Sequence, residues 1–119
     1  MGRQLQPQEI VAHYVLPAIR KELAVSMKAS GSDQKTIAKK LCVTEAAVSQ
    51  YINEKRASTI TFPIILKEAI GESANEIKDN LSFTRETQKI LKVAMKEGVT
   101  CKVCHEVAKT PASCRVCFE

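Results

Sequence analysis

The chain has 119 residues, a net charge of +5 and an apolar fraction of 45%, which suits one ordinary domain or one small domain with an appendage. No apolar run approaches the ~18 residues that a membrane span requires, and the N-terminus lacks a signal-peptide core, so we expect a cytoplasmic protein. Aromatic residues make up 4% of the chain and Trp is absent, which argues against a base-stacking platform for single-stranded nucleic acid.

The positive charge is concentrated in the first half of the chain. Residues 1–57 contain nine Lys and Arg against five Asp and Glu, whereas residues 58–119 contain nine against eight. This asymmetry is expected if the first half faces an anion such as a phosphate backbone, and a solvated surface explains it equally well.

Residues 8–29 carry apolar side chains at helical spacing. Pro17 interrupts this stripe, so we expect a kink or a break, with Pro17 in the first turn of the second piece. Gly31 follows as the residue that ends the helix.

Two short helices are predicted next, over residues 33–42 and 44–54. Asp33 and Thr44 are the N-cap residues, since their side-chain oxygens can accept a hydrogen bond from the first turn. The residues predicted to be buried are Ile37, Ala38 and Leu41 in the first helix and Ala47, Val48, Tyr51 and Ile52 in the second.

Residues 57–61 are predicted to connect these helices to a second helical region that begins at Phe62, with Pro63 in its first turn. Gly71 and the capping-box pattern Ser73–Glu76 predict a break and a restart. Two further amphipathic pieces are expected at 74–81 and 84–97, with the inward residues Ala74, Ile77, Leu81, Ile90, Leu91 and Ala94, before Gly98 ends the last helix. No segment has a convincing strand pattern, so the predicted fold is all-α, a bundle of about five to seven helices with a short tail.

The stretch from Gln34 to Asn53 is the most informative part of the chain. Its two short helices can meet across a tight turn because Ala38 is small where they cross, while Leu41 and Val43 fill the angle between them. The second helix has an outward face of short side chains, mostly polar, that could meet base edges in a major groove about 12 Å wide. This face consists of Thr44, Glu45, Ala46, Ser49, Gln50 and Asn53.

This stretch resembles the helix–turn–helix of the Xre/Cro and phage-repressor family, through Gln34, Ala38 and the run from Ala47 to Tyr51. With the preceding VLPAIRKELA it resembles archaeal predicted regulators, some of which carry a cysteine-rich tail. The resemblance implies that Gln34 contacts a phosphate, and that Thr44, Glu45, Ala46, Ser49 and Gln50 lie at the bases. It also implies a homodimer on a palindromic operator in double-stranded DNA, with phosphates neutralised by Lys35, Lys39, Lys55 and Arg56.

Cys42 departs from the family pattern, which usually has Gly at this turn because the backbone there favours a left-handed conformation. A Cβ at positive φ costs roughly 1 kcal/mol. We therefore expect a slightly rearranged turn with Cys42 half buried as a small apolar side chain.

Four cysteines lie near the C-terminus as two C-x-x-C pairs with nine residues between them, at Cys101, Cys104, Cys114 and Cys117. Clustered cysteines in a cytoplasmic protein more often bind metal than form structural disulfides. We expect each pair to form a tight turn that directs both thiolates at one ion, giving a single tetrathiolate site, with His105 solvated or outside the ligand set.

The metal is not fixed by the spacing. Zinc ribbons usually separate their pairs by ~12–20 residues and place Gly after the second cysteine, whereas residues 99–119 contain no Gly. A 4Fe-4S cluster is therefore slightly favoured over Zn²⁺, and a metal-free dithiol switch stays open.

These features predict three regions: a helix–turn–helix DNA-binding domain at 8–57, a helical dimerisation or linker region at 58–98, and a metal-binding tail at 99–119. The leading hypothesis is a sequence-specific transcription regulator whose metal centre senses redox or iron–sulfur status. The alternatives are the same role with a structural zinc, or a protein-interaction module such as an antitoxin-like adaptor. No catalytic motif or small-molecule substrate is indicated, and a thiol–disulfide enzyme would need a βαβ context that the chain lacks.

Overall fold

A computed structural model describes residues 6–53, 60–107 and 116 of the chain. These residues are all-α, as predicted. The segments are α1 (Pro7–Ile10), η1 (Val11–Val15), α2 (Leu16–Ala29), α3 (Gln34–Leu41), α4 (Glu45–Asn53), α5 (Ile64–Glu76), α6 (Asn80–Lys96) and α7 (Val99–Val107). Since α1, η1 and α2 follow one another without a gap, they form one long helix, and the described residues contain six helices in all.

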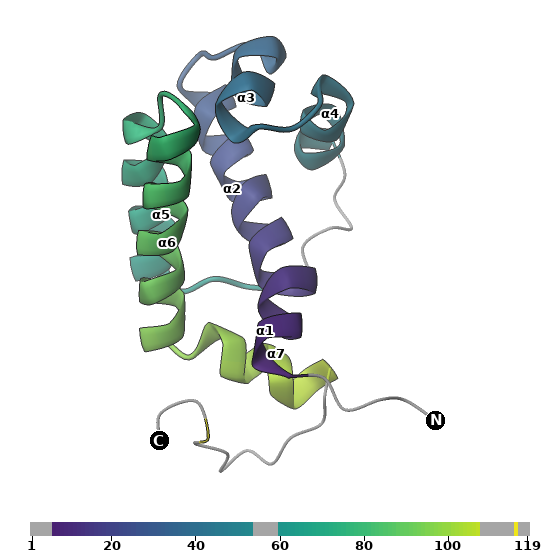
Figure 1. The fold of residues 1–119 in the computed structure, drawn as a ribbon, viewed down its shortest axis with the longest axis vertical. Helices are drawn as coiled ribbons and strands as arrows, with labels where there is room; N and C mark the ends of the chain where they lie inside the picture. The colour runs from purple at the N-terminus through teal and green to yellow at the C-terminus, as the bar shows by residue number, and fades with distance from the viewer. Residues whose placement is uncertain (1–5, 54–59, 108–115, 117–119) are drawn as a thin grey trace.

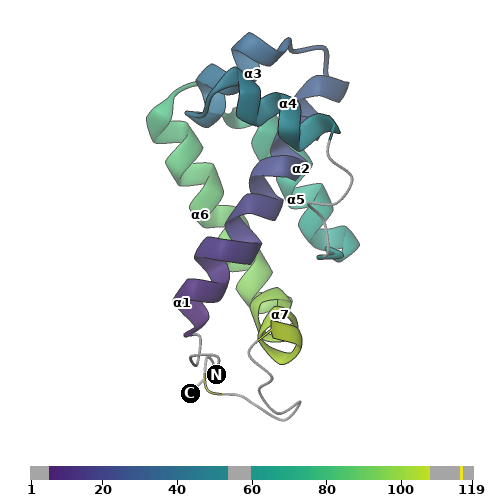
Figure 2. The same ribbon diagram turned by 90° about the vertical axis from the view of Figure 1, so that its right-hand side faces the viewer.

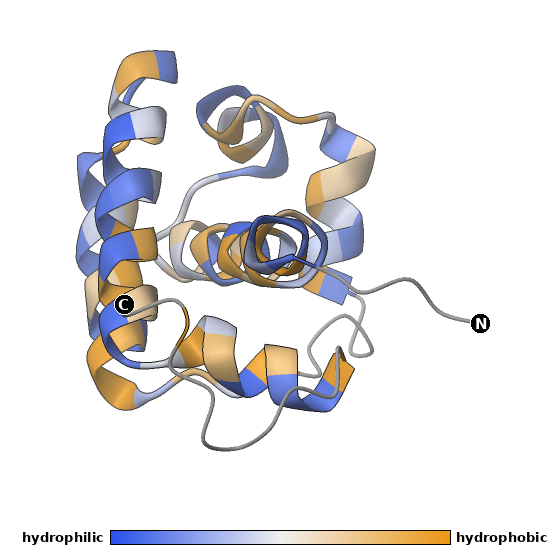
Figure 3. Ribbon diagram, turned by 60° about the horizontal axis from the view of Figure 1, so that its bottom comes forward, coloured by the Kyte–Doolittle hydropathy of each residue, from blue (hydrophilic) through white to orange (hydrophobic). Residues whose placement is uncertain are grey.

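The long helix α1–α2 lies at the centre of the molecule. The antiparallel pair α5–α6 runs along one side of it, α3 and α4 lie over its C-terminal end, and α7 crosses its N-terminal end (Figures 1 and 2). Viewed from the α7 end, the long helix is nearly end-on with the other helices around it (Figure 3). Ile19, Leu23, Leu66, Ile70 and Ile90 are buried in a single core shared by these helices.

Pro17 does not break the first helix. The turns immediately before it, Val11–Val15, are wound as a π-helix. A proline lacks the N–H that would bond four residues back and its ring clashes with the carbonyl there, so a wider turn before it lets the helix continue. Pro17 lies in the first turn of α2, as predicted, and Gly31 ends the segment with φ at +98°.

The predicted break at Gly71 is wrong, because α5 continues through it to Glu76. Ser73 does not cap a new helix; its side chain is buried and hydrogen-bonded to Glu86 of α6. Burial of Leu66, Ile70 and Ala74 on one face holds α5 together past the glycine.

The predicted helical piece at 74–81 is also wrong. Ile77 is extended, with φ at −80° and ψ at 119°, and α6 begins only at Asn80. The side chain of Asp79 accepts a hydrogen bond from the backbone N–H of Ser82 at 2.8 Å, which caps α6. Leu81, predicted to face inward, is 66% exposed because it lies in the first turn of α6, on the side away from the core.

Candidate functional site

The helix–turn–helix predicted at Gln34–Asn53 is formed by α3 and α4. Asp33 caps α3 by accepting a hydrogen bond from the backbone N–H of Thr36 at 2.8 Å. Thr44 caps α4, since its Oγ1 accepts one from the backbone N–H of Ala47 at 3.0 Å. Both caps agree with the sequence prediction, and the bond from Thr36 lowers the pKa of the Asp33 carboxyl.

The turn between the two helices centres on Cys42, whose backbone is left-handed at φ 58° and ψ 40°. The N–H of Val43 donates to the carbonyl of Ala38 at 3.0 Å, and that of Cys42 donates to Lys39 at 3.4 Å. This is the Schellman pattern, which normally has Gly at the left-handed position. The expected rearrangement of the turn is therefore absent.

Cys42 is exposed, not half buried as predicted. Its Sγ donates a hydrogen bond to Oδ1 of Asn80 at 2.8 Å. Asn80 is the first residue of α6, so this bond links the turn of the helix–turn–helix to the start of another helix. No sequence signal could indicate it, because the two residues are 38 positions apart.

The inner faces of α3 and α4 close on the core as expected. Ile37, Leu41 and Val48 are each at most 1% exposed. Ala47, Tyr51 and Ile52, which were also predicted to be buried, are only half buried. These contacts leave the opposite side of α4 without a packing role in the described residues.

The outer face of α4 carries the side chains predicted to meet base edges. Thr44, Glu45, Ala46, Gln50 and Asn53 are exposed and Ser49 is half buried. Nδ2 of Asn53 donates to Oγ of Ser49 at 3.1 Å. Four of these residues line a shallow hollow, namely Ala46, Ser49, Gln50 and Asn53.

Only some of the residues predicted to contact phosphates are among the described residues. On α3, Lys35 and Lys39 are exposed and Gln34 is half buried at the first helical position. Lys55 and Arg56 lie outside the described residues.

Cys101 and Cys104 lie on α7, so the predicted tight turn is wrong for this first C-x-x-C pair. The segment is helical because Gly98, with φ at +74°, ends α6 and lets Val99 and Val103 turn into the core. A spacing of three residues still places both thiols on one side of the helix. Cys101 is half buried, and Cys104 is 8% exposed.

The other two predicted ligands, Cys114 and Cys117, lie outside the described residues. Within 6–53, 60–107 and 116, no three His, Cys, Asp or Glu side chains form a group that could hold a metal ion. The described residues thus supply two neighbouring thiols on one helix face, and His105 is half buried beside them. Two thiols on one helix face can supply half of a four-thiolate ligand set.

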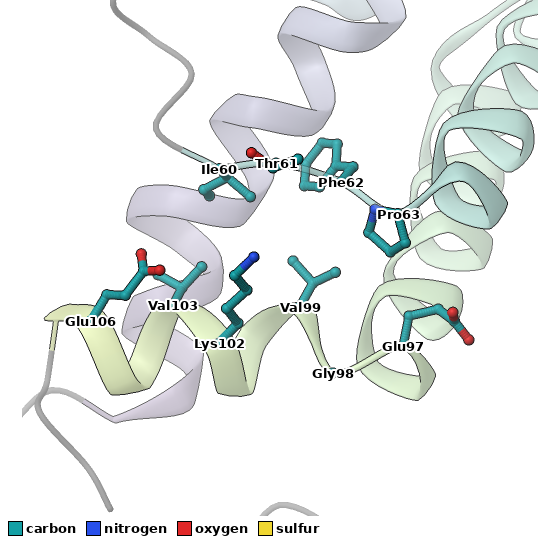
Figure 4. A pocket seen from close by; sticks show the side chains of 10 residues that line it. All are labelled: Ile60, Thr61, Phe62, Pro63, Glu97, Gly98, Val99, Lys102, Val103 and Glu106. Atoms are coloured by element: carbon teal, nitrogen blue, oxygen red, sulfur yellow. The ribbon is translucent and has the colours of Figure 1, made fainter. Parts of the chain in front are cut away.

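A cavity of 390 Å³ separates α7 from the segment Ile60–Pro63. Its walls include the apolar side chains of Phe62, Val99 and Val103, and Lys102 rises from α7 towards Ile60–Pro63 (Figure 4). Residues 60–63 follow α4 closely in the sequence and precede α5. The cysteine-bearing helix therefore faces the chain that leads out of the helix–turn–helix.

One carboxyl group that sequence reasoning did not single out lies on α6. Glu86 is 5% exposed, and its Oε2 pairs with Nζ of Lys89 at 3.1 Å. Burial alone would raise the pKa of this carboxyl, but hydrogen bonds from Lys89 and Ser73 outweigh it and the pKa is lowered. Glu86 could be recognised as buried only after the buried face of α6 had been identified.

Comparison with protein families, with curated proteins and with solved structures found no match to this chain. Among the described helices none is both long and apolar enough to cross a bilayer.

Proposed function

We propose that the protein is a sequence-specific regulator of transcription that binds double-stranded DNA as a homodimer, with α4 in the major groove. The observation that carries the proposal is the outer face of α4. It is exposed, its side chains are short and mostly polar, and it follows a capped, left-handed turn from α3. A helix fits the major groove of B-form DNA, where side-chain donors and acceptors distinguish all four base pairs.

The roles divide by position. Side chains on the outer face of α4 would read bases, and those of α3 with Lys55 and Arg56 would hold phosphates. The N-terminus of α3, with Gln34 in its first turn, adds favourable backbone N–H groups for a phosphate. A symmetric dimer would place two α4 helices in successive grooves of a palindromic operator.

Two substitutions separate these roles. Gln50→Ala should lower affinity for the specific operator by a few-fold to roughly 100-fold, corresponding to ~1–3 kcal/mol, with little effect on random DNA. Lys39→Ala should weaken binding to both DNAs and reduce the salt dependence, because one phosphate contact is lost. Fluorescence anisotropy over a range of salt concentrations measures both quantities.

The matched controls are Gln88→Ala on α6 and Lys67→Ala on α5, which remove the same exposed side chains far from α4 in sequence. Equal behaviour of Gln50→Ala and Lys39→Ala on the two DNAs would refute the division of roles. Equal behaviour of Gln50→Ala and Gln88→Ala would refute base reading by α4.

For the cysteines, we propose one centre held by Cys101, Cys104, Cys114 and Cys117, with a 4Fe-4S cluster slightly favoured over Zn²⁺. Such a cluster would supply reversible redox chemistry, and zinc would supply a rigid cross-link. The position of α7 supports a regulatory role. This helix contributes Val99, Val103 and Cys104 to the core and faces Ile60–Pro63, so a change at the thiols could reach the helix–turn–helix.

Anaerobically purified protein tests the centre directly. The expected result is a brown protein with about four iron and four sulfide per chain. Cys101→Ser should lose the metal, and Cys42→Ser, which removes the one cysteine outside the cluster, should keep it. A colourless protein with one zinc per chain would exclude the redox role, and a metal-free protein would exclude the centre.

A further inference from the structure

The α5–α6 pair has a groove between residues 69–76 of α5 and 86–93 of α6. This groove has a volume of 480 Å³, and its lining residues are Ala69, Glu72, Ser73, Glu76, Glu86, Lys89, Ile90 and Val93. All of its lining residues come from α5 and α6 and none from α2, so the groove opens on the side away from the core. Small side chains at Ala69 and Ser73 permit another helix to approach closely.

The two borders of this groove have opposite charge. On α5, three exposed acidic residues lie within about 80° of arc at 100° per residue: Glu68, Glu72 and Glu76. On α6, four exposed basic residues lie within about 60° of arc: Arg85, Lys89, Lys92 and Lys96. Both rows fall on the flank of their helix that borders the groove, because Glu72 and Lys89 also line it.

These rows are almost unused within one copy of the protein. In the described residues, Lys89 pairs with Glu86 on its own helix, and no ion pair joins the acidic row to the basic row. An apolar side chain accompanies the acidic row: Ile65 lies one turn before Ala69 and is 59% exposed.

We propose that the groove-bearing face of α5 and α6 is the interface between two copies of this chain, with α5 of each copy packed against α6 of its partner. A two-fold axis parallel to the helices brings each acidic row opposite a basic row, twice per dimer. The Ser73–Glu86 hydrogen bond shows which residues of the two helices lie side by side, with Ser73 of α5 at the same height as Glu86 of α6. At this register Glu68 lies opposite Lys92 of the partner, and Ile65 lies opposite the Val93 level.

The direction of the axis has a second, independent support, which rests on the proposed function. Both α3 and α4 lie at one end of the long helices (Figure 1). An axis parallel to those helices keeps the two α4 segments at the same end of the dimer, where a single duplex can meet both. A perpendicular axis would place like charges together and send the two α4 helices to opposite ends.

Sedimentation of the full-length protein without DNA tests the interface, so its outcome does not depend on DNA binding. Wild type should be dimeric at about 100 µM, a concentration that saturates any dimer with a micromolar Kd. Ile65→Lys should abolish the dimer, because it places a charge in the apolar part of the interface. Val25→Lys is the matched control on α2, at a residue 41% exposed, and should leave the dimer intact.

Charge reversal identifies the paired rows. Glu68→Lys and Lys92→Glu should each weaken the dimer by roughly tenfold, since each turns two symmetry-related attractions into repulsions. An equimolar mixture of the two variants should form a heterodimer as stable as wild type, which intrachain effects cannot produce. Circular dichroism checks that each variant is folded.

A monomeric wild type, a dimer unaffected by Ile65→Lys, or a mixture that fails to associate would each overturn the interface. Base reading by a single α4 would survive all three results, although a monomeric wild type would also refute the homodimer of the proposed function. Conversely, a wild-type protein that is dimeric but binds specific and random DNA equally well would refute the proposed function without contradicting the interface.

Discussion

Cys42 offers a test of the turn that joins α3 to α4. Its backbone is left-handed, at φ 58° and ψ 40°, a conformation that costs L-residues roughly 1–2 kcal/mol. Glycine avoids this cost, but it loses more conformational entropy on folding, and this loss offsets about 0.4–1 kcal/mol of its advantage. A net preference for glycine of roughly 0.5–1 kcal/mol remains.

The comparison that isolates this effect is Cys42→Gly against Cys42→Ala. Both variants remove the hydrogen bond from Sγ to Asn80, so their difference reports the backbone alone. Cys42→Gly should therefore unfold about 2–5 °C higher than Cys42→Ala. Thermal unfolding followed by circular dichroism measures the difference.

Gln88, an exposed residue in α6, is the control position. In a helix interior Ala is more favourable than Gly by about 1 kcal/mol, so the order of the two substitutions should invert there. If Ala were as good as Gly at Cys42, or better, the left-handed turn would be refuted and the helix–turn–helix geometry with it.

Two further outcomes follow from the caps and the core. Hydrogen bonds from Thr36 and Ser82 lower the pKa values of Asp33 and Asp79 below the ordinary 3.8. As pH falls, these two carboxyls therefore take up protons at a higher pH in the unfolded chain than in the folded one. The ionised caps add to the free energy of unfolding above the ordinary pKa, and this contribution is lost as pH falls through the lower pKa values of the folded state. Urea unfolding at a series of pH values from neutral to acid should show this loss in the free energy of unfolding. The double variant Asp33→Asn, Asp79→Asn should lose less stability over the same pH range. An unchanged dependence of stability on pH in the double variant would contradict the role of the two caps. Val48→Ala should destabilise the fold by about 2 kcal/mol because Val48 is fully buried, and DNA affinity should fall only as far as the folded fraction falls. A loss of stability under about 0.5 kcal/mol would show that α4 does not pack as described.

The local signals in the sequence predicted α3 and α4 well. Asp33 and Thr44 are strong N-cap residues directly before apolar helical spacing, and both cap their helices as predicted. The rearranged turn expected at Cys42 was wrong, because its backbone is left-handed. Each of these features depends on contacts within a few residues. The exposed face of α4 followed from them, because it is what remains once the buried residues are placed.

The α5–α6 region was predicted less well because several start signals compete there. Ser73–Glu76 and Asp79–Ser82 both resemble capping boxes, and only the second caps a helix. The choice depends on tertiary packing: Ser73 is buried beside Glu86, a residue of another helix. The spacing of Cys101 and Cys104 was likewise ambiguous, since it fits a tight turn or one turn of helix. The inward positions of Val99 and Val103 select the helix.

The most direct test of DNA reading by α4 is a footprint of the protein on the DNA upstream of its own gene, with random DNA as competitor. The expected result is two protected patches on one face of the duplex, about 10 base pairs apart, that disappear with Gln50→Ala and persist with Gln88→Ala. Sequence reading by α4 would be contradicted if random competitor DNA removed the protection as easily as it removes non-specific binding. It would also be contradicted if Gln50→Ala left the protection unchanged.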